Sequence, residues 1–168
     1  PAELEEYEEL RKQNLLTLRV AMAMSVPPGT RFTELAKYRA LKERFRGPDL
    51  KAGAIKIMLD GVIESRTAAM LEPYEGSNES GTPAWSEPFY REMVEKADAA
   101  GLQVYTHAIG DRAVRMALDA YEQALRVNGN KNARWRIEHI ETISPADIPR
   151  FARIGVLASM QPIHADPG

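Results

Sequence analysis

Short apolar runs alternate along the chain with longer segments of helical spacing. Apolar runs of four to eight or more residues predict buried strands, whereas apolar residues three and four apart predict helices. Strands are expected at 14–24, 52–59, 102–107, 134–139 and 156–162, and helices at 2–13, 32–45, 86–100, 111–125 and 144–155. Strands and helices that alternate at this spacing form βαβ units, so the pattern predicts an α/β fold with about five parallel strands.

Helix ends carry recognisable signals. Ser86, Asp111 and Ser144 are expected as N-caps, because their side chains can accept hydrogen bonds from the first free N–H groups of a helix. Gly101 and Gly155 are expected to end two of these helices.

One long segment does not fit the alternation. Residues 61–85 contain Gly, Ser, Pro and Asn but show no sustained period. A connection of this length inside a compact domain is more often functional than idle. We therefore expect a loop that lies over a site.

Composition narrows the class of protein. A chain of 168 residues suffices for one well-buried domain. A net charge of -2 gives no sign of a nucleic-acid or anionic membrane partner, and no apolar stretch approaches the ~20 residues of a membrane span. The absence of cysteine excludes disulfides and a thiol nucleophile. It is compatible with a reducing cytosol, and we expect a cytoplasmic location.

A lysine lies inside one of the predicted strands. Side chains alternate along a strand, so Ile55 and Ile57 would pack under helices while Lys56 faces the interior of a barrel. A buried lysine must be paired, neutralised or modified. Pairing with Asp60 or a neighbouring carboxylate is the plainest explanation. A Schiff base or a carbamate formed with carbon dioxide are the functional alternatives.

His107 and His139 each stand at the end of a predicted strand. The carboxyl ends of neighbouring parallel strands meet at one edge of the sheet, where ligands bind in such folds. Alternation groups Ile137 with His139, and puts Arg136 and Glu138 on a face that helices should cover. Either histidine alone is more often structural, but a pair at consecutive strand ends predicts metal binding.

Three blocks of sequence carry a resemblance. In this order and spacing, "IKIMLDGVIESRTAAMLEPY", "VYTHAIGDRAV" and "RIEHIETISPADIPRFARIGVLASMQPIH" resemble the amidohydrolase superfamily. The similarity is to family 3, the branch that includes N-substituted formamide deformylase-like proteins. It implies a (β/α)8 barrel with a metal centre at the strand carboxyl ends, which hydrolyses non-peptide C–N bonds such as those of amides and formamides.

The resemblance also implies roles for individual residues. Lys56 matches a carbamylated lysine that bridges two metal ions, and His107 and His139 match ligands from the following two strands. The implied cofactor is a divalent metal, with zinc expected, as one or two ions. The expected substrate contacts are Arg66 and Tyr74 from the long loop and, by the resemblance, Gln161 and His164.

Parts of the family pattern are absent from the sequence. The superfamily's His-x-His pair is missing, because the chain has three histidines and none lie two apart. The general-base aspartate of the last strand is expected beyond Gly168. A closed barrel needs about 250 residues. We therefore expect residues 1–168 to be a fragment, a partial (β/α)8 barrel of roughly strands three to seven, with little activity alone.

Two other hypotheses stay open. Lys56 could form a Schiff base in an aldolase-like barrel, or the chain could be a non-catalytic half-barrel that serves in assembly. An incomplete parallel sheet has two open edges, which favour pairing with another copy of the chain. If the chain is part of an amidohydrolase, its expected partner is a small amide-type substrate. We also expect a homo-oligomer formed through the open sheet edges.

Overall fold

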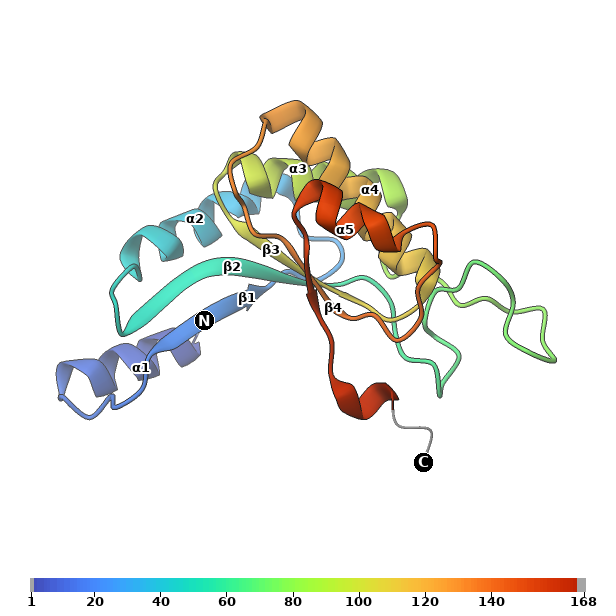
Figure 1. Cartoon of the computed structure of the whole chain (residues 1–168). Helices are drawn as coiled ribbons and strands as arrows, with labels where there is room; N and C mark the ends of the chain where they lie inside the picture. Colours follow the sequence, from blue (N-terminus) through green and yellow to red (C-terminus); the bar gives the residue numbers. More distant parts are fainter. Residues whose placement is uncertain (1, 166–168) are drawn as a thin grey trace.

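The computed structural model describes residues 2–165, and side chains as far as residue 163. Its centre is one parallel sheet whose five strands lie in sequence order (Figure 1). The strands are β1 (Val20–Ser25), β2 (Leu50–Met58), β3 (Gln103–Ala108), β4 (Arg136–His139) and β5 (Leu157–Ser159). The predicted α/β fold is confirmed. The sheet is not closed within the described residues, as expected of a partial barrel.

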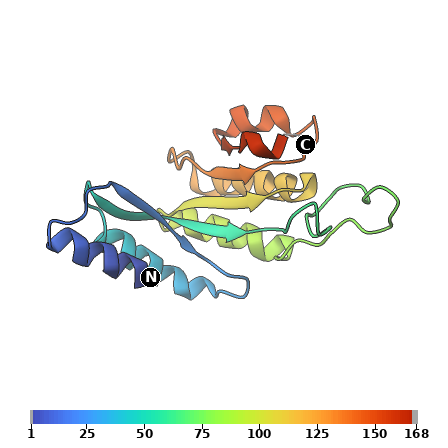
Figure 2. The same ribbon diagram turned by 90° about the horizontal axis from the view of Figure 1, so that it is seen from below.

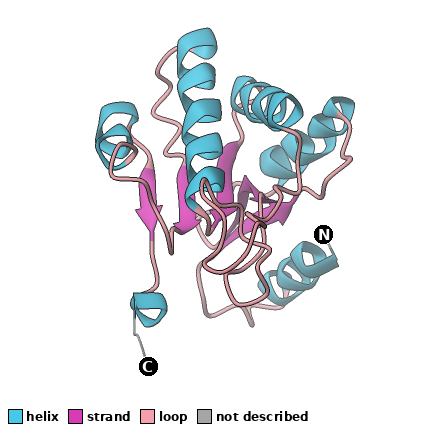
Figure 3. Ribbon diagram, turned by 90° about the vertical axis from the view of Figure 1, so that its right-hand side faces the viewer, coloured by secondary structure: helices cyan, strands magenta, loops and turns pink. Residues whose placement is uncertain are grey.

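Between residues 2 and 165, four α-helices follow the strands in turn and cover one face of the sheet, and one further helix precedes the first strand (Figure 3). They are α1 (Ala2–Lys12), α2 (Leu35–Arg44) with the preceding 3-10 turn η1 (Phe32–Glu34), α3 (Glu87–Ala99), α4 (Asp111–Asn128), α5 (Ile148–Ile154) and the 3-10 turn η2 (Pro162–Ala165). In Figure 3, α2 to α5 form a layer on one side of the strands. In the part of the chain that the structure describes, the opposite face of the sheet has no such layer, and we call it the open face (Figure 3). None of the helices within residues 2–165 is long and apolar enough to cross a bilayer.

The hydrophobic core lies between the sheet and this helix layer. Ile55 and Ile57 of β2 are fully buried there, as the alternation predicts, while Lys56 lies on the open face. The core also contains a cluster of hydrogen-bonded hydroxyl groups. Thr106 Oγ1 of β3 lies 2.7 Å from the hydroxyl oxygen of Tyr90 in α3 and 2.7 Å from that of Tyr121 in α4. The helix-covered face of β3 is therefore held by polar as well as apolar contacts.

The first strand is shorter than its apolar run predicts. β1 begins at Val20, where pairing with Leu50 starts, and Leu15 and Leu18 before it are exposed. The predicted strand 14–24 is thus wrong in its first half, because an apolar run does not define where a neighbouring strand begins to pair.

Two helix starts also differ from the prediction. Gly110, not Asp111, occupies the N-cap of α4, and the Asp111 carboxylate accepts a hydrogen bond from the Leu71 N–H at 2.8 Å. Ser144 begins a turn, and α5 starts only at Ile148. At Asp111 a tertiary contact takes the carboxylate that would have capped the helix, and at Ser144 the Asp147 N–H donates to the Ser144 carbonyl in a turn that precedes the helix.

The long connection between β2 and α3 contains neither helix nor strand in residues 61–85, as predicted. Figure 2 shows its tip extending away from the sheet. Its base is fixed: Ala68 and Ala69 are fully buried, and the Ala69 carbonyl accepts hydrogen bonds from Arg112 and Ala113 in the first turn of α4. The base, rather than the tip, borders the carboxyl end of the sheet.

Candidate metal centre

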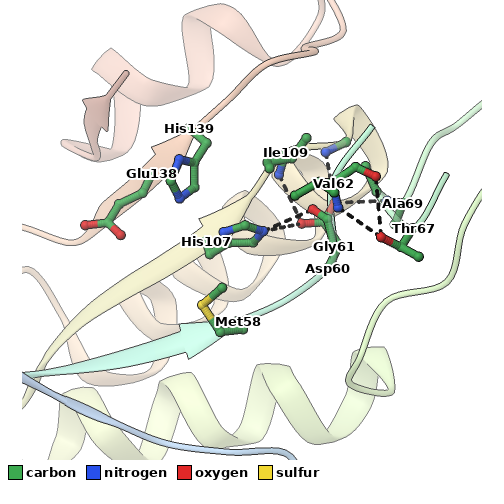
Figure 4. Close-up of polar contacts among 12 residues, drawn as sticks. Met58, Asp60, Gly61, Val62, Thr67, Ala69, His107, Ile109, Glu138 and His139 are labelled. Atoms are coloured by element: carbon green, nitrogen blue, oxygen red, sulfur yellow. Dashed lines mark hydrogen bonds and ion pairs between the residues drawn. The ribbon is translucent and has the colours of Figure 1, made fainter. Parts of the chain in front are cut away.

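Two imidazoles meet at the carboxyl ends of β3 and β4. The ring centroids of His107 and His139 lie 4.6 Å apart, with an angle of 64° between the ring planes (Figure 4). The strand register explains the proximity, because Ala108, the residue after His107, pairs with His139. The convergence that the sequence predicts at this sheet edge is present in the structure.

His139 reaches this position by leaving the regular strand geometry. Its φ is +79°, and Ile140 follows with a φ of +55°. Ile137 is fully buried beneath the helices, so strict alternation would direct His139 to that same face. The left-handed backbone turns the ring toward His107 instead. Non-glycine residues rarely adopt such φ values, and they are concentrated at functional sites.

The faces predicted for the rest of β4 are wrong as a result. Arg136 and Glu138 lie on the open face, not the helix-covered one, because Ile137 between them is buried under the helices. Glu138 forms ion pairs with Lys56 of β2 and with Arg136. The carboxylate partner of Lys56 is therefore Glu138 and not Asp60.

The surroundings of Lys56 make its proton easier to lose than that of an exposed lysine. Burial and the nearby Arg136 guanidinium lower the pKa of Lys56 to about 8, whereas the Glu138 carboxylate opposes the shift by favouring the ammonium. Arg136 in turn lies over the ring of Tyr105, 3.7 Å from its centroid. The open face thus carries a connected set of charges next to the imidazoles.

Asp60 lies two residues after the end of β2 and is buried beside His107. Its carboxylate accepts three backbone hydrogen bonds, from Ala69 at 2.9 Å, Ile109 at 3.0 Å and Gly110 at 2.9 Å. Burial raises the pKa of Asp60, and the three N–H donors oppose this rise only in part. This carboxylate joins the base of the long loop to the turn between β3 and α4.

The two nitrogens of His107 have different surroundings. Nε2 lies 3.1 Å from the Gly61 carbonyl oxygen and 3.5 Å from Asp60 Oδ1. Nδ1 is buried and has no hydrogen-bond partner among the described residues. Burial lowers the pKa of His107, which favours the neutral ring that a metal ligand requires. A buried nitrogen left without a partner, next to a second imidazole, suits a metal ligand.

The donors present do not make a complete site. Within the described residues, no group of three or more His, Cys, Asp and Glu side chains gathers as a metal ion would require. The two imidazoles therefore do not form a complete metal site with side chains of these types in the described part of the chain. Zinc in a catalytic site usually has three protein ligands and one open position.

The residues predicted to contact substrate lie in the long loop and in the segment after β5. Gln161 Oε1 lies 2.9 Å from His139 Nδ1, so this side chain orients the ring. The Tyr74 hydroxyl donates to the Ala68 carbonyl at 2.8 Å and ties the loop to its own base. Arg66 is exposed on the loop with a φ of +57°. The side chain of His164 lies outside the described part of the structure.

A cavity of about 630 Å³ lies at the other end of the sheet. Lys51, Gln103 and Arg134 are among its lining residues, and all three come from the amino ends of strands or the turns before them. The imidazoles do not line it, so this cavity is separate from the candidate centre.

A parallel α/β sheet with polar ligands at the carboxyl ends of its strands is the architecture of barrel enzymes. The chain belongs to the amidohydrolase family, whose model matches residues 1–167.

Relatives of known sequence agree with this assignment. The chain is 34% identical over 138 residues to protein LONG AFTER FAR-RED 3 of Arabidopsis thaliana, covering 82% of this chain and 24% of that protein. It is 32% identical over 121 residues to the putative amidohydrolase YtcJ of Bacillus subtilis, covering 71% and 22%. N-substituted formamide deformylase of Arthrobacter pascens is 28% identical over 108 residues, covering 64% and 19%.

Solved structures show the same relationship. An uncharacterized metal-dependent hydrolase from Pyrococcus furiosus superposes with a TM-score of 0.75 and 32% identity, covering 95% of this chain and 32% of that one. Its counterpart from Pyrococcus horikoshii gives 0.76 and 28%, covering 95% and 31%. The chain thus spans less than a third of the proteins that it matches.

Proposed function

We propose that this chain supplies three ligands of a metal centre in an enzyme that hydrolyses the non-peptide C–N bond of small amide-type molecules. The observation that carries the proposal is the buried, unpartnered Nδ1 of His107 beside the ring of His139. Membership of the amidohydrolase family and the metal-dependent hydrolases among the solved structures support it.

Lys56, His107 and His139 would hold the ion, for which zinc is expected, as one or two ions in the complete enzyme. Such an ion supplies Lewis acidity, which lowers the pKa of water and polarises the scissile carbonyl. We place residues 1–168 at roughly strands three to seven of a barrel. Further ligands and the general-base aspartate would then come from other strands of that barrel.

Lys56 is proposed to act as a carbamate. Its free amine would attack carbon dioxide, forming an N–C bond and releasing one proton, and the product carries two oxygen donors. A pKa lowered to about 8 leaves part of the amine free near neutral pH. The ion pair with Glu138 competes with this reaction because it holds the ammonium form.

The other residues of the chain would orient the ligands and the substrate. Gln161 holds the ring of His139 through Nδ1, and the Gly61 carbonyl holds that of His107. Substrate contacts by Arg66, Tyr74, Gln161 and His164 stay predictions. A cytoplasmic location and self-association through the edges β1 and β5 stay predictions as well.

Metal analysis tests the proposed ligands. After dialysis against limiting zinc, the wild-type chain should retain metal, and the double variant His107→Ala, His139→Ala should lose it. Gln103→Ala is a matched control, because Gln103 precedes His107 on the same face of β3, and within the described residues its side chain hydrogen-bonds to Arg134 and Tyr105 but to neither histidine. Equal zinc content in wild type and double variant would contradict the proposal.

Carbon-13 NMR with labelled bicarbonate tests the carbamate. A carbamate signal that disappears in Lys56→Arg would support it. Borohydride trapping of a carbonyl compound on Lys56 would favour the aldolase-like alternative instead. Robust hydrolysis of a formamide by residues 1–168 alone would contradict the expected inactivity of the isolated chain.

A further inference from the structure

The carboxylate of Asp60 connects parts of the chain that are far apart in the sequence. Its side chain is fully buried. Oδ2 accepts from Ala69 and Gly110, while Oδ1 accepts from Ile109 and lies 3.5 Å from His107 Nε2. Three segments of chain therefore meet at this one group: the end of β2, the base of the long loop and the turn after β3.

The same contacts determine which nitrogen of His107 carries the proton. A carbonyl oxygen can only accept, so the Gly61 carbonyl at 3.1 Å requires hydrogen on Nε2. The Asp60 carboxylate on the same side also accepts only. In the neutral ring Nδ1 then carries the lone pair, and this is the buried nitrogen that has no partner among the described residues.

The Gly61 peptide, whose carbonyl faces His107, packs tightly against Thr67. A Cβ at this position would lie 2.0 Å from Thr67 Oγ1 and 2.5 Å from Thr67 Cβ. The Gly61 N–H donates to the Thr67 carbonyl at 3.1 Å, and the Val62 N–H donates to Thr67 Oγ1 at 3.0 Å. The peptide that faces His107 is thus held on both sides, as the dashed contacts in Figure 4 show.

We propose that Asp60 is a positioning residue for His107. Together with the Gly61 carbonyl it holds the ring as the Nε2–H tautomer and presents the lone pair of Nδ1 toward His139. The functional meaning of this arrangement rests on the proposed metal centre, but the tautomer itself is a property of the metal-free chain. Partners that orient a ligating histidine in this way typically change metal affinity by 10- to 100-fold when they are mutated.

The isosteric change Asp60→Asn separates positioning from packing. An asparagine has one accepting oxygen, and Ala69 and Gly110 both donate to the Oδ2 side. The oxygen should therefore stay there, which directs the NH2 group at His107 Nε2 and Ile109. An NH2 group donates, so it favours a ring whose Nε2 carries the lone pair.

Long-range 1H–15N correlation spectra of the zinc-free chain at pH 8 give the tautomer. The chain has only three histidines, and the loss of signals in His107→Gln assigns His107. In wild type, Nε2 should show the shift of a protonated nitrogen and Nδ1 that of a lone pair. In Asp60→Asn, both tautomers should be present, and zinc affinity should fall about 10- to 100-fold.

Asp111→Asn is the matched control. Asp111 also binds the loop, through the Leu71 N–H at 2.8 Å, but within the described residues its carboxylate forms no hydrogen bond or ion pair with His107. This variant should keep the wild-type tautomer. If Asp60→Asn does not fold, Gly61→Ala replaces it: its Cβ would crowd the Thr67 side chain that holds the peptide facing Nε2, so this variant should give the same mixture of tautomers.

Two results would overturn the inference. One is an Nδ1–H tautomer in wild type, and the other is an unchanged tautomer in a folded Asp60→Asn variant or, where that variant does not fold, in Gly61→Ala. Neither result by itself decides whether zinc binds, which metal analysis of wild type and of the double histidine variant measures separately. Conversely, a chain that shows the expected tautomers but binds no zinc would leave the positioning role intact and remove the proposed metal centre.

Discussion

The carboxyl ends of β3 and β4 each bring one imidazole to the same place, but they hold it differently. His107 continues the regular alternation of β3 and is buried, with the Asp60 carboxylate and the Gly61 carbonyl behind it. His139 has a left-handed backbone, and its Nδ1 lies 2.9 Å from the side chain of Gln161, a residue from beyond β5. The comparison indicates that the β3 end is the rigid half of the site, and that the β4 end is held by local conformation.

The largest effect is expected from Asp60→Ala. It leaves three buried N–H groups without acceptors, each of which costs about 1–3 kcal/mol. We expect the free energy of unfolding, measured by urea denaturation, to fall by roughly 3–9 kcal/mol. Gln161→Ala removes the corresponding support of His139 and should lose only about 1 kcal/mol. Similar losses in the two variants would contradict the comparison.

Gly110→Ala should have the next largest effect. A Cβ on Gly110 would lie 2.1 Å from the Ala69 carbonyl oxygen, a backbone atom that cannot move without the loop. Overpacking of this kind typically costs about 1–3 kcal/mol. Gly53→Ala in β2 is the control, because its Cβ would meet nothing within 4 Å. A stable Gly110→Ala variant, by thermal and urea denaturation, would show that the β3 end is less rigid than we infer.

Alkaline pH tests the helix-covered side of β3. Burial raises the pKa of Tyr90 and Tyr121 beside Thr106. The native state therefore keeps these protons above pH 10, where the unfolded chain loses them, so stability falls as pH rises. Each tyrosine should contribute roughly 1.4 kcal/mol of this loss by pH 11. Tyr90→Phe should show a shallower decline than wild type, and an equal decline would contradict the assignment.

The smallest effect concerns the backbone alone. At position 107, His107→Gly should be less stable than His107→Ala by about 0.5–1 kcal/mol, as is usual in a strand. At position 139, with its φ of +79°, the order should reverse, with His139→Gly more stable than His139→Ala by about 1 kcal/mol. Urea denaturation of the four variants gives both differences. The same order at both positions would exclude the left-handed conformation in solution.

Much of the fold follows from the period of the apolar residues. In β2, Ile55 and Ile57 are buried and Lys56 faces the open side, because alternation is a property of any regular strand. The loop 61–85 was equally predictable from its lack of a period. The start of β1 was not, since it depends on where a neighbouring strand begins to pair.

The site was predictable only where the backbone is regular. His107 follows its strand, so its position could be inferred. The orientation of His139, and with it the faces of Arg136 and Glu138, depends on a positive φ that no residue type in the sequence indicates. The sequence indicates Asp60 only as a partner of Lys56, and its position beside His107 was not predicted, because its partners Ile109 and Gly110 are about fifty residues further along the chain. The Asp-Gly pair directly after a buried strand was the one local signal for it.

The clamped base of the long loop has a consequence for how such a protein can diversify. Ala68 and Ala69 are locked to α4, whereas most residues between 72 and 79 are exposed. Lengthening a surface loop changes its closure entropy only slowly, by about 0.6 kcal/mol per doubling. Insertions or deletions in that tip can therefore accumulate while the imidazoles stay in place, so related enzymes are free to reshape their entrance without rebuilding their chemistry.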